Sequence, residues 1–187
     1  MKKLILSLVL AFGILAISAQ AQAAKLDPNN TLYLNLKYGR VVIQMFPKVA
    51  PKTVAQIKTL VRQGFYNGLK WHRVIAGFMA QTGDPTGTGC CGSSLPNVPA
   101  EFSSIPFTRG IVGMARSQDI NSGNSQFFIM LDDTPSLNGQ YTVWGKVVSG
   151  MQYVDKIKKG DPNDNGKVAD PDTIISMQIA ADADKKK

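Results

Sequence analysis

Residues 71–81 read WHRVIAGFMAQ, and this run is the most informative part of the chain. It places a charged guanidinium, Arg73, and an amide, Gln81, among apolar side chains such as Phe78 and Met79. Both polar groups carry hydrogen-bond donors that need partners if they are buried. The run has no metal-ligand pair, no nucleophile beside a base and no phosphate loop. It therefore suits a site that binds a small apolar group and polarises an amide without covalent chemistry.

A core strand with a surface arginine and glutamine would explain the same run, because short motifs give false matches. Three further blocks decide between the two interpretations: residues 109–115 read RGIVGMA, 125–129 read SQFFI and 137–147 read LNGQYTVWGKV. In this order and at these separations, the four blocks resemble the cyclophilin family of peptidyl-prolyl cis-trans isomerases. The resemblance extends from about Thr31 to Ile179.

The resemblance implies a role for each matching position, without a metal or a cofactor. It makes Arg73 the catalytic cation, and it makes Gln81 a residue that binds the substrate backbone or positions Arg73. The remaining positions line the proline pocket (Phe78, Met79, Phe128 and Leu137) and the neighbouring groove and rim (Gly87, Ala115, Arg116, Gln126 and Tyr141).

Three positions depart from the better-known eukaryotic pattern. Arg116 stands where asparagine is usual, Ser136 where tryptophan is usual, and Tyr141 where histidine is usual. In eukaryotic members of the resembled family, that tryptophan contacts cyclosporin A, the drug from which the family takes its name. Ser136 is therefore the change that most affects the pocket wall.

The periodicity of the chain predicts many short strands and two helices. Residues 31–46 read as a hairpin that turns at Tyr38-Gly39, and residues 174–179 as a last strand. Apolar residues at helical spacing predict helices over 51–63 and 151–159. This pattern favours a mainly β fold with a closed antiparallel sheet. The resemblance refines the expectation to a closed barrel of about eight strands capped by two α-helices, with a packed interior and the active site on the outer surface.

The first 23 residues read as a cleaved secretory signal peptide. Lys2 and Lys3 precede an apolar stretch, and Ala21-Gln22-Ala23 forms a small-residue cleavage site. A membrane anchor is disfavoured because the stretch is short and no basic stop follows it. We expect an isomerase domain over 24–183 and a basic tail over 184–187. The expected location is the periplasm, with secretion as the alternative and no stable membrane insertion after cleavage.

The composition restricts the partners of the mature chain. Removal of Lys2 and Lys3 lowers the formal charge from +8 to +6, and part of that charge lies in the tail. The lysines form no stripe and do not alternate with aromatic residues, so nucleic-acid binding is not supported. We expect a monomer that acts on proline-containing unfolded or exported polypeptides. The alternatives are a non-catalytic binder of proline peptides and a redox protein built on Cys90-Cys91.

The adjacent cysteines lie in a glycine-rich loop, residues 87–94. Their spacing does not match a zinc site, and export implies an oxidising compartment. The sequence leaves open a disulfide between neighbours, an intermolecular disulfide or two thiols.

Two other features have simple structural explanations. Residues 161–172 match part of a calcium loop, but aspartate replaces the usual bidentate glutamate, so an ordinary turn is favoured. His72 is the only histidine, and we interpret it as structural because rotation about a prolyl bond needs no proton transfer.

Overall fold

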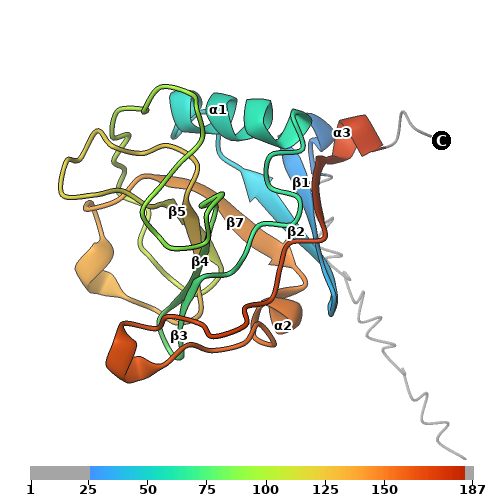
Figure 1. Cartoon of the computed structure of the whole chain (residues 1–187). Coiled ribbons are helices and arrows are strands. Elements are labelled where there is room, and N and C mark those ends of the chain that lie inside the picture. Colours follow the sequence, from blue (N-terminus) through green and yellow to red (C-terminus); the bar gives the residue numbers. More distant parts are fainter. Residues whose placement is uncertain (1–25, 184–187) are drawn as a thin grey trace, which may run out of the picture.

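The structure is a computed structural model that describes residues 26–183. The predicted signal peptide (1–23) and basic tail (184–187) lie outside the described residues. Within them, one curled antiparallel sheet of eight strands is accompanied by three α-helices (Figure 1). The strands are β1 (Thr31–Leu36), β2 (Gly39–Met45), β3 (Arg73–Ile75), β4 (Met79–Thr82), β5 (Ile111–Met114), β6 (Phe127–Met130), β7 (Val143–Ser149) and β8 (Ser176–Ile179).

The sheet is open, so the prediction of a closed barrel is wrong in this respect. Its strand order is β3-β4-β6-β5-β7-β2-β1-β8, and the two end strands do not pair. The free edge of β3 is covered by the loop over 160–168, where Val74 N donates to Gly166 O. The chain segments that precede β3 and β8 do pair with each other, since Trp71 N donates a hydrogen bond to Asp172 O. The three residues of β3 thus have a loop as their second neighbour instead of β8.

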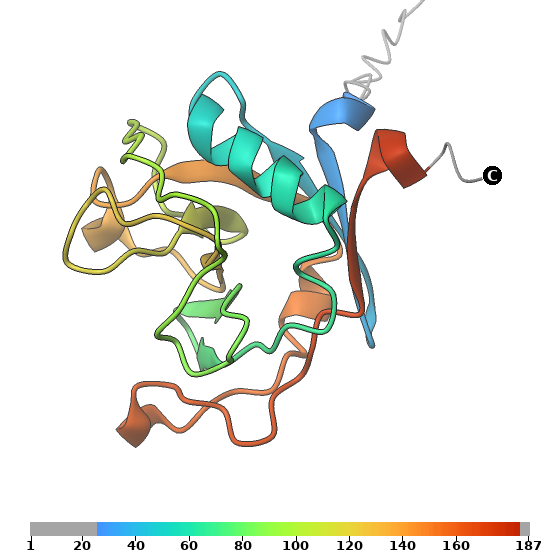
Figure 2. The ribbon, with the colours of Figure 1, turned by 45° about the horizontal axis from the view of Figure 1, so that its top comes forward.

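The helices are α1 (Pro51–Arg62), α2 (Met151–Val154) and α3 (Ala180–Ala183), one more than the two predicted. Helix α1 buries Val54, Ile57 and Leu60 and crosses one end of the sheet (Figures 1 and 2). Helix α2 is shorter than the predicted 151–159. No helix within residues 26–183 is long and apolar enough to cross a membrane.

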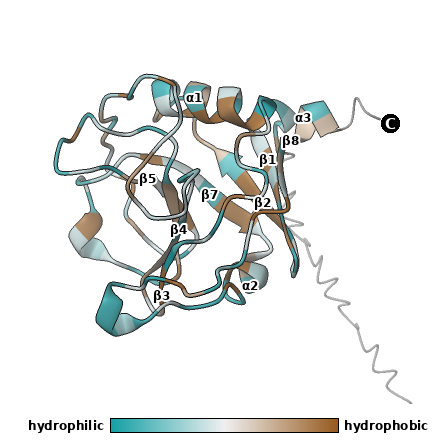
Figure 3. Ribbon diagram, in the orientation of Figure 1, coloured by the Kyte–Doolittle hydropathy of each residue, from teal (hydrophilic) through white to brown (hydrophobic). Residues whose placement is uncertain are grey.

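Alternation along β6 separates the core from the surface that carries the site. Phe127 is fully buried, and its ring lies edge-on to those of Tyr66, Trp71 and Trp144 at centroid distances of 5.5–6.2 Å. Because side chains alternate along a strand, Phe128 points to the opposite face. There it belongs to a second, smaller apolar cluster. Figure 3 shows hydrophobic colouring on the central strands and mostly hydrophilic loops around them.

Candidate active site

The pairing of the strands places the main polar and aromatic residues of the predicted site in one row. Arg73 on β3 is directly opposite Gln81 on β4, and Gln81 is directly opposite Phe128 on β6. Gly113 on β5 is opposite Phe128 and completes the row. A Cβ at Gly113 would lie 2.4 Å from Phe128 Cζ, so the absent side chain leaves room for the ring. The register alone therefore brings a cation, an amide and an aromatic ring onto one face.

A cavity of about 110 Å³ opens beside this row. Its size is of the order of the roughly 150 Å³ cavity that holds benzene in an engineered protein, so a five-membered ring fits. Nine of the eleven predicted site residues line it: Arg73, Phe78, Met79, Gln81, Ala115, Arg116, Phe128, Leu137 and Tyr141.

The two other predicted residues lie elsewhere. Gln126 lines a larger adjacent hollow that also touches Gln81, Ala115 and Arg116. Gly87 lines neither cavity, and a Cβ there would meet the Lys70 side chain at 2.7 Å. The structure thus brings ten of the eleven residues to two adjoining cavities.

The floor of the smaller cavity is buried and apolar. Met79 and Phe128 are 1% and 5% exposed. The Phe128 ring stacks on Phe107 at 5.8 Å and meets Tyr141 edge-on at 5.6 Å. Phe107 was not predicted from the sequence, because it lies outside the four blocks and reaches the site only through the fold. Such a floor can bind a pyrrolidine ring by apolar contact.

Arg73 supplies the positive charge of the site. Its Nη1 donates to Gln81 Oε1 over 3.1 Å, and its Nε and Nη2 donate to Asn165. Burial lowers the pKa of Arg73, while the nearby Tyr141 acts to raise it. Since the ordinary pKa of arginine exceeds 12, the side chain remains charged at neutral pH.

A chain of amides connects Arg73 to the glycine-rich loop. Gln81 Nε2 donates to Gln126 Oε1 over 2.9 Å. Gln126 Nε2 in turn donates to the backbone oxygens of Gly89 and Cys91 over 3.0 and 2.8 Å. These bonds set the orientation of both glutamine amides, so Gln81 presents its oxygen to Arg73.

The rim of the cavity contains two of the three departures from the eukaryotic pattern, and they contact each other. The Arg116 guanidinium lies over the Tyr141 ring at 4.6 Å from the centroid. Arg116 also donates to the backbone oxygen of Gln140. Ser136, the third departure, is exposed on the 3-10 turn Pro135–Leu137 next to the cavity residue Leu137.

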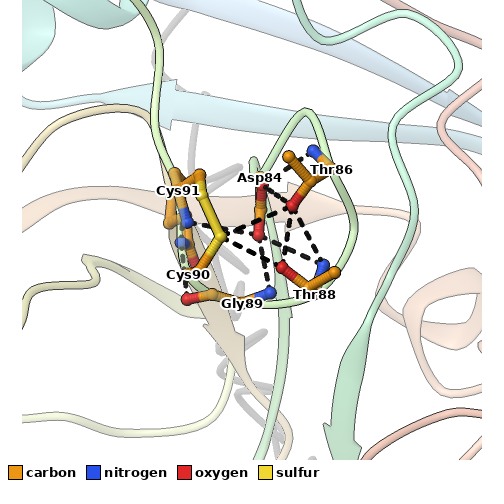
Figure 4. The surroundings of a disulfide bond; sticks show 7 residues. Asp84, Thr86, Thr88, Gly89, Cys90 and Cys91 are labelled. Carbon is orange, nitrogen blue, oxygen red and sulfur yellow. Dashed lines mark hydrogen bonds between the residues drawn. A yellow bond between two sulfur atoms is a disulfide. The ribbon is translucent and has the colours of Figure 1, made fainter.

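The adjacent cysteines form a disulfide with each other, which decides among the three states left open by the sequence (Figure 4). The Asp84 carboxylate holds their loop by accepting from the backbone N–H groups of Thr86, Gly89 and Cys91. Burial acts to raise the pKa of Asp84, but these bonds and the Thr86 hydroxyl outweigh it and hold the pKa below its ordinary value. Asp84 lies within 4.8 Å of both sulfurs, but sulfurs bonded to each other are not thiolate ligands.

Replacing both Cys90 and Cys91 with serine is expected to leave the predicted isomerase activity within about threefold of wild type, a change of about 0.65 kcal/mol, because neither side chain lines the cavity beside Arg73. The bonds from Gln126 and to Asp84 use backbone groups of this loop, which serine retains. Activity of both proteins should be measured with and without dithiothreitol. A large, reversible loss in reduced wild type that is absent from the double variant would contradict this expectation.

The structure also accounts for the two side features of the sequence. In the 161–172 loop, both oxygens of Asn165 accept from Arg73, and the Asp172 carboxylate accepts from Tyr38 and pairs with Lys37. Two of the oxygens expected to bind calcium are therefore engaged by other groups. His72 is buried, and burial lowers its pKa despite the opposing effect of Asp84, so the ring is neutral at neutral pH.

Comparison with known proteins agrees with this geometry. The family model described as cyclophilin type peptidyl-prolyl cis-trans isomerase/CLD matches residues 31–179. A probable peptidyl-prolyl cis-trans isomerase of Brucella suis is 58% identical over 185 residues, covering 92% of this chain and 93% of the relative. A peptidyl-prolyl cis-trans isomerase of Helicobacter pylori is 43% identical over 137 residues, covering 70% and 83%.

Solved structures have the same fold. The cyclophilin AquaCyp293 from Hirschia baltica superposes with a TM-score of 0.75 at 29% identity, covering 84% of this chain and 76% of that one. A Cryptosporidium parvum cyclophilin type isomerase, crystallised in the presence of the dipeptide Ala-Pro, gives 0.72 at 30% identity, covering 80% and 98%.

Proposed function

The chain belongs to the cyclophilin-type peptidyl-prolyl cis-trans isomerases, and we propose that it acts through the Arg73 face on proline-containing polypeptides exported to the periplasm. It is an enzyme of class EC 5.2.1.8, acting on X–Pro bonds of polypeptides. The observation that carries the proposal is the row of Arg73, Gln81 and Phe128 across three paired strands.

Rotation about an X–Pro bond is slow because the amide loses its resonance on the way. The barrier is about 18–20 kcal/mol, and uncatalysed exchange takes tens to hundreds of seconds. The two planar isomers differ by only about 0.5–1 kcal/mol. A catalyst must therefore bind the twisted amide more tightly than either planar form.

Each part of the face has a role in that preference. The cavity over Phe128 and Met79 binds the pyrrolidine ring and holds one side of the bond. Twisting returns a lone pair to the prolyl nitrogen, and the Arg73 guanidinium beside the cavity stabilises it. Gln81 keeps Arg73 in place, and the larger hollow beside Gln126 and Ala115 receives the chain that precedes proline. The reaction forms no covalent intermediate and moves no proton to the enzyme. The isomerisation rate of a variant that lacks the Arg73 side chain tests this assignment directly.

The proposed location is supported by residues 1–23, which have the basic start, apolar stretch and small-residue end of a signal peptide. There, the enzyme would accelerate the slow prolyl steps in the folding of envelope proteins.

Residues 1–40 fused to alkaline phosphatase are expected to yield active phosphatase in a Gram-negative host, because that enzyme needs the disulfides of an oxidising compartment. Mass spectrometry of the full-length chain purified from the periplasmic fraction should find Ala24 as the first residue. Changing Ala21 and Ala23 to bulky residues is the matched control and should block cleavage. An uncleaved wild-type chain that stays in the cytosol would refute the proposed location.

A further inference from the structure

Asn165 lies in the loop that covers the free edge of β3, and the orange segment runs beside that strand in both views (Figures 1 and 2). The loop is fixed to the strand because Val74 N donates to Gly166 O over 2.8 Å. Residues 165 and 166 have φ angles of 49° and 76°. A Cβ at Gly166 would lie 2.3 Å from Ile75 Cγ1, so only glycine permits this approach. The backbone thus places Asn165 at a fixed position beside Arg73.

Two oxygen atoms of Asn165 bind the Arg73 guanidinium. Nε donates to the backbone oxygen over 3.0 Å, and Nη2 donates to Oδ1 over 2.8 Å. On the other side, Gln81 Oε1 accepts from Nη1. A guanidinium carries five N–H groups in one rigid plane. With the 3.9 Å contact from Nη1 to Met79 Sδ, these bonds use four of them, fix the plane and leave one N–H of Nη2 for a substrate.

The hydrogen-bonding partners of Arg73 are all uncharged, namely oxygens of Asn165 and Gln81 and the sulfur of Met79. In residues 26–183, no carboxylate lies within ion-pair distance of Arg73, although Asp161 and Asp164 belong to the same loop as Asn165. A carboxylate in place of the Asn165 amide would offset the positive field, and it would do so most strongly where burial excludes water. The amide orients the cation and leaves its charge available.

We propose that Asn165 is a positioning residue for Arg73, holding the guanidinium in its reactive orientation with acceptors that do not neutralise it. The inference rests on the proposed catalytic role of Arg73. It assigns the loop over 160–168 a part in the reaction, although this loop lies outside the four sequence blocks.

Asn165→Gly is the most selective variant, because glycine adopts the same positive φ and keeps the backbone acceptor, so that of the two contacts to Arg73 only the one from Oδ1 is lost. We expect kcat to fall about tenfold, since small displacements of a catalytic group can cost up to about 10²-fold. The dissociation constant of a proline peptide, measured by NMR titration, should change less than about twofold, because the apolar floor is untouched.

Asn165→Asp tests whether this partner of Arg73 must be uncharged. Aspartate has nearly the same shape and can make the same two contacts, so orientation is preserved while a negative charge is added. We expect kcat to fall by at least about tenfold, because an opposite charge about 3 Å away offsets much of the field of Arg73. A wild-type kcat in this variant would overturn the need for a neutral partner.

The orientation itself can be observed by NMR of the Arg73 side chain. In wild type, the Nη2 protons should exchange places slowly, because Oδ1 restrains rotation about the Cζ–Nη2 bond. In Asn165→Gly they should average to one signal. Unchanged rotation together with a wild-type kcat would overturn the positioning role.

Asp170→Gly is the matched control for Asn165→Gly. Asp170 also has a positive φ of 52°, is exposed and bonds Lys158 instead of Arg73. This variant should retain wild-type kcat.

Arg73→Ala measured in parallel separates the two proposals. If it keeps the wild-type rate, the proposed site fails. If it loses the rate and Asn165→Gly does not, only the role of Asn165 fails.

Discussion

Replacing Arg73 with alanine is expected to lower kcat/KM for an Ala-Ala-Pro-Phe peptide by about 10²-fold or more, since one preorganised electrostatic group is typically worth about 10²–10³-fold. A hundredfold loss corresponds to about 2.7 kcal/mol of transition-state stabilisation. The effect should fall on the rate and only weakly on peptide affinity, because the cavity over Phe128 and Met79 stays intact.

The variant is expected to remain folded. Arg73 is half-buried and belongs to neither apolar cluster, and its backbone pairing with Gln81 does not depend on the side chain. Its circular dichroism spectrum and melting temperature should stay close to those of wild type. Arg73→Lys should show an intermediate rate, because lysine keeps the charge but cannot form the planar fork to Asn165 and Gln81. Equal kcat/KM for wild type and Arg73→Ala in the protease-coupled assay would remove Arg73 from the mechanism.

The second large effect is expected on the affinity for cyclosporin A and depends on Ser136. The structure places this residue on an exposed turn next to Leu137 of the cavity wall. Serine offers little apolar area and no indole donor, and removing a tryptophan anchor from an interface typically costs about 2–4 kcal/mol. We therefore expect the unmodified enzyme to be inhibited poorly by cyclosporin A. Ser136→Trp should tighten binding by roughly one to three orders of magnitude.

Turnover of the peptide should change little in Ser136→Trp, because the Arg73 row is not altered. Ser149→Trp, at the exposed end of β7 and outside the cavity, is the control for adding a tryptophan to the surface. Inhibition constants and kcat/KM should be measured for all three proteins. Nanomolar inhibition of the unmodified enzyme would show that Ser136 does not limit binding of the drug.

Patterns within short stretches of sequence predicted those elements that are formed by residues close together in the chain. The hairpin of β1 and β2 and the amphipathic helix that begins at Pro51 are where alternation and helical spacing placed them. The turn itself is Lys37-Tyr38, one residue before the predicted Tyr38-Gly39, because Leu36 pairs with Gly39. Helix α3 escaped prediction because it is four residues long and directly follows β8. An ion pair between Arg62 on α1 and Asp182 on α3 helps to hold α3 in position. These two residues are distant in the chain, so no local pattern indicates their contact.

The closure of the sheet could not be predicted from periodicity, because it depends on which segment occupies the edge of β3. The same loop supplies Asn165, whose contact with Arg73 spans 92 positions. Phe107 likewise reaches the cavity floor through stacking on Phe128. By contrast, Arg73, Gln81 and Phe128 lie in runs with a recognisable order, so the resemblance included them. Residues that support the site were missed because they lie in loops without a local pattern.

The contact between Arg116 and Tyr141 ties together two positions that are 25 residues apart. A histidine at 141 would provide a weaker aromatic face for the cation, and an asparagine at 116 would leave the tyrosine ring without its cover. In the evolution of this branch, exchange of one position alone would pass through an intermediate in which the contact is weakened or lost. The two sites are therefore expected to covary among descendants, so that the rim is inherited as a pair.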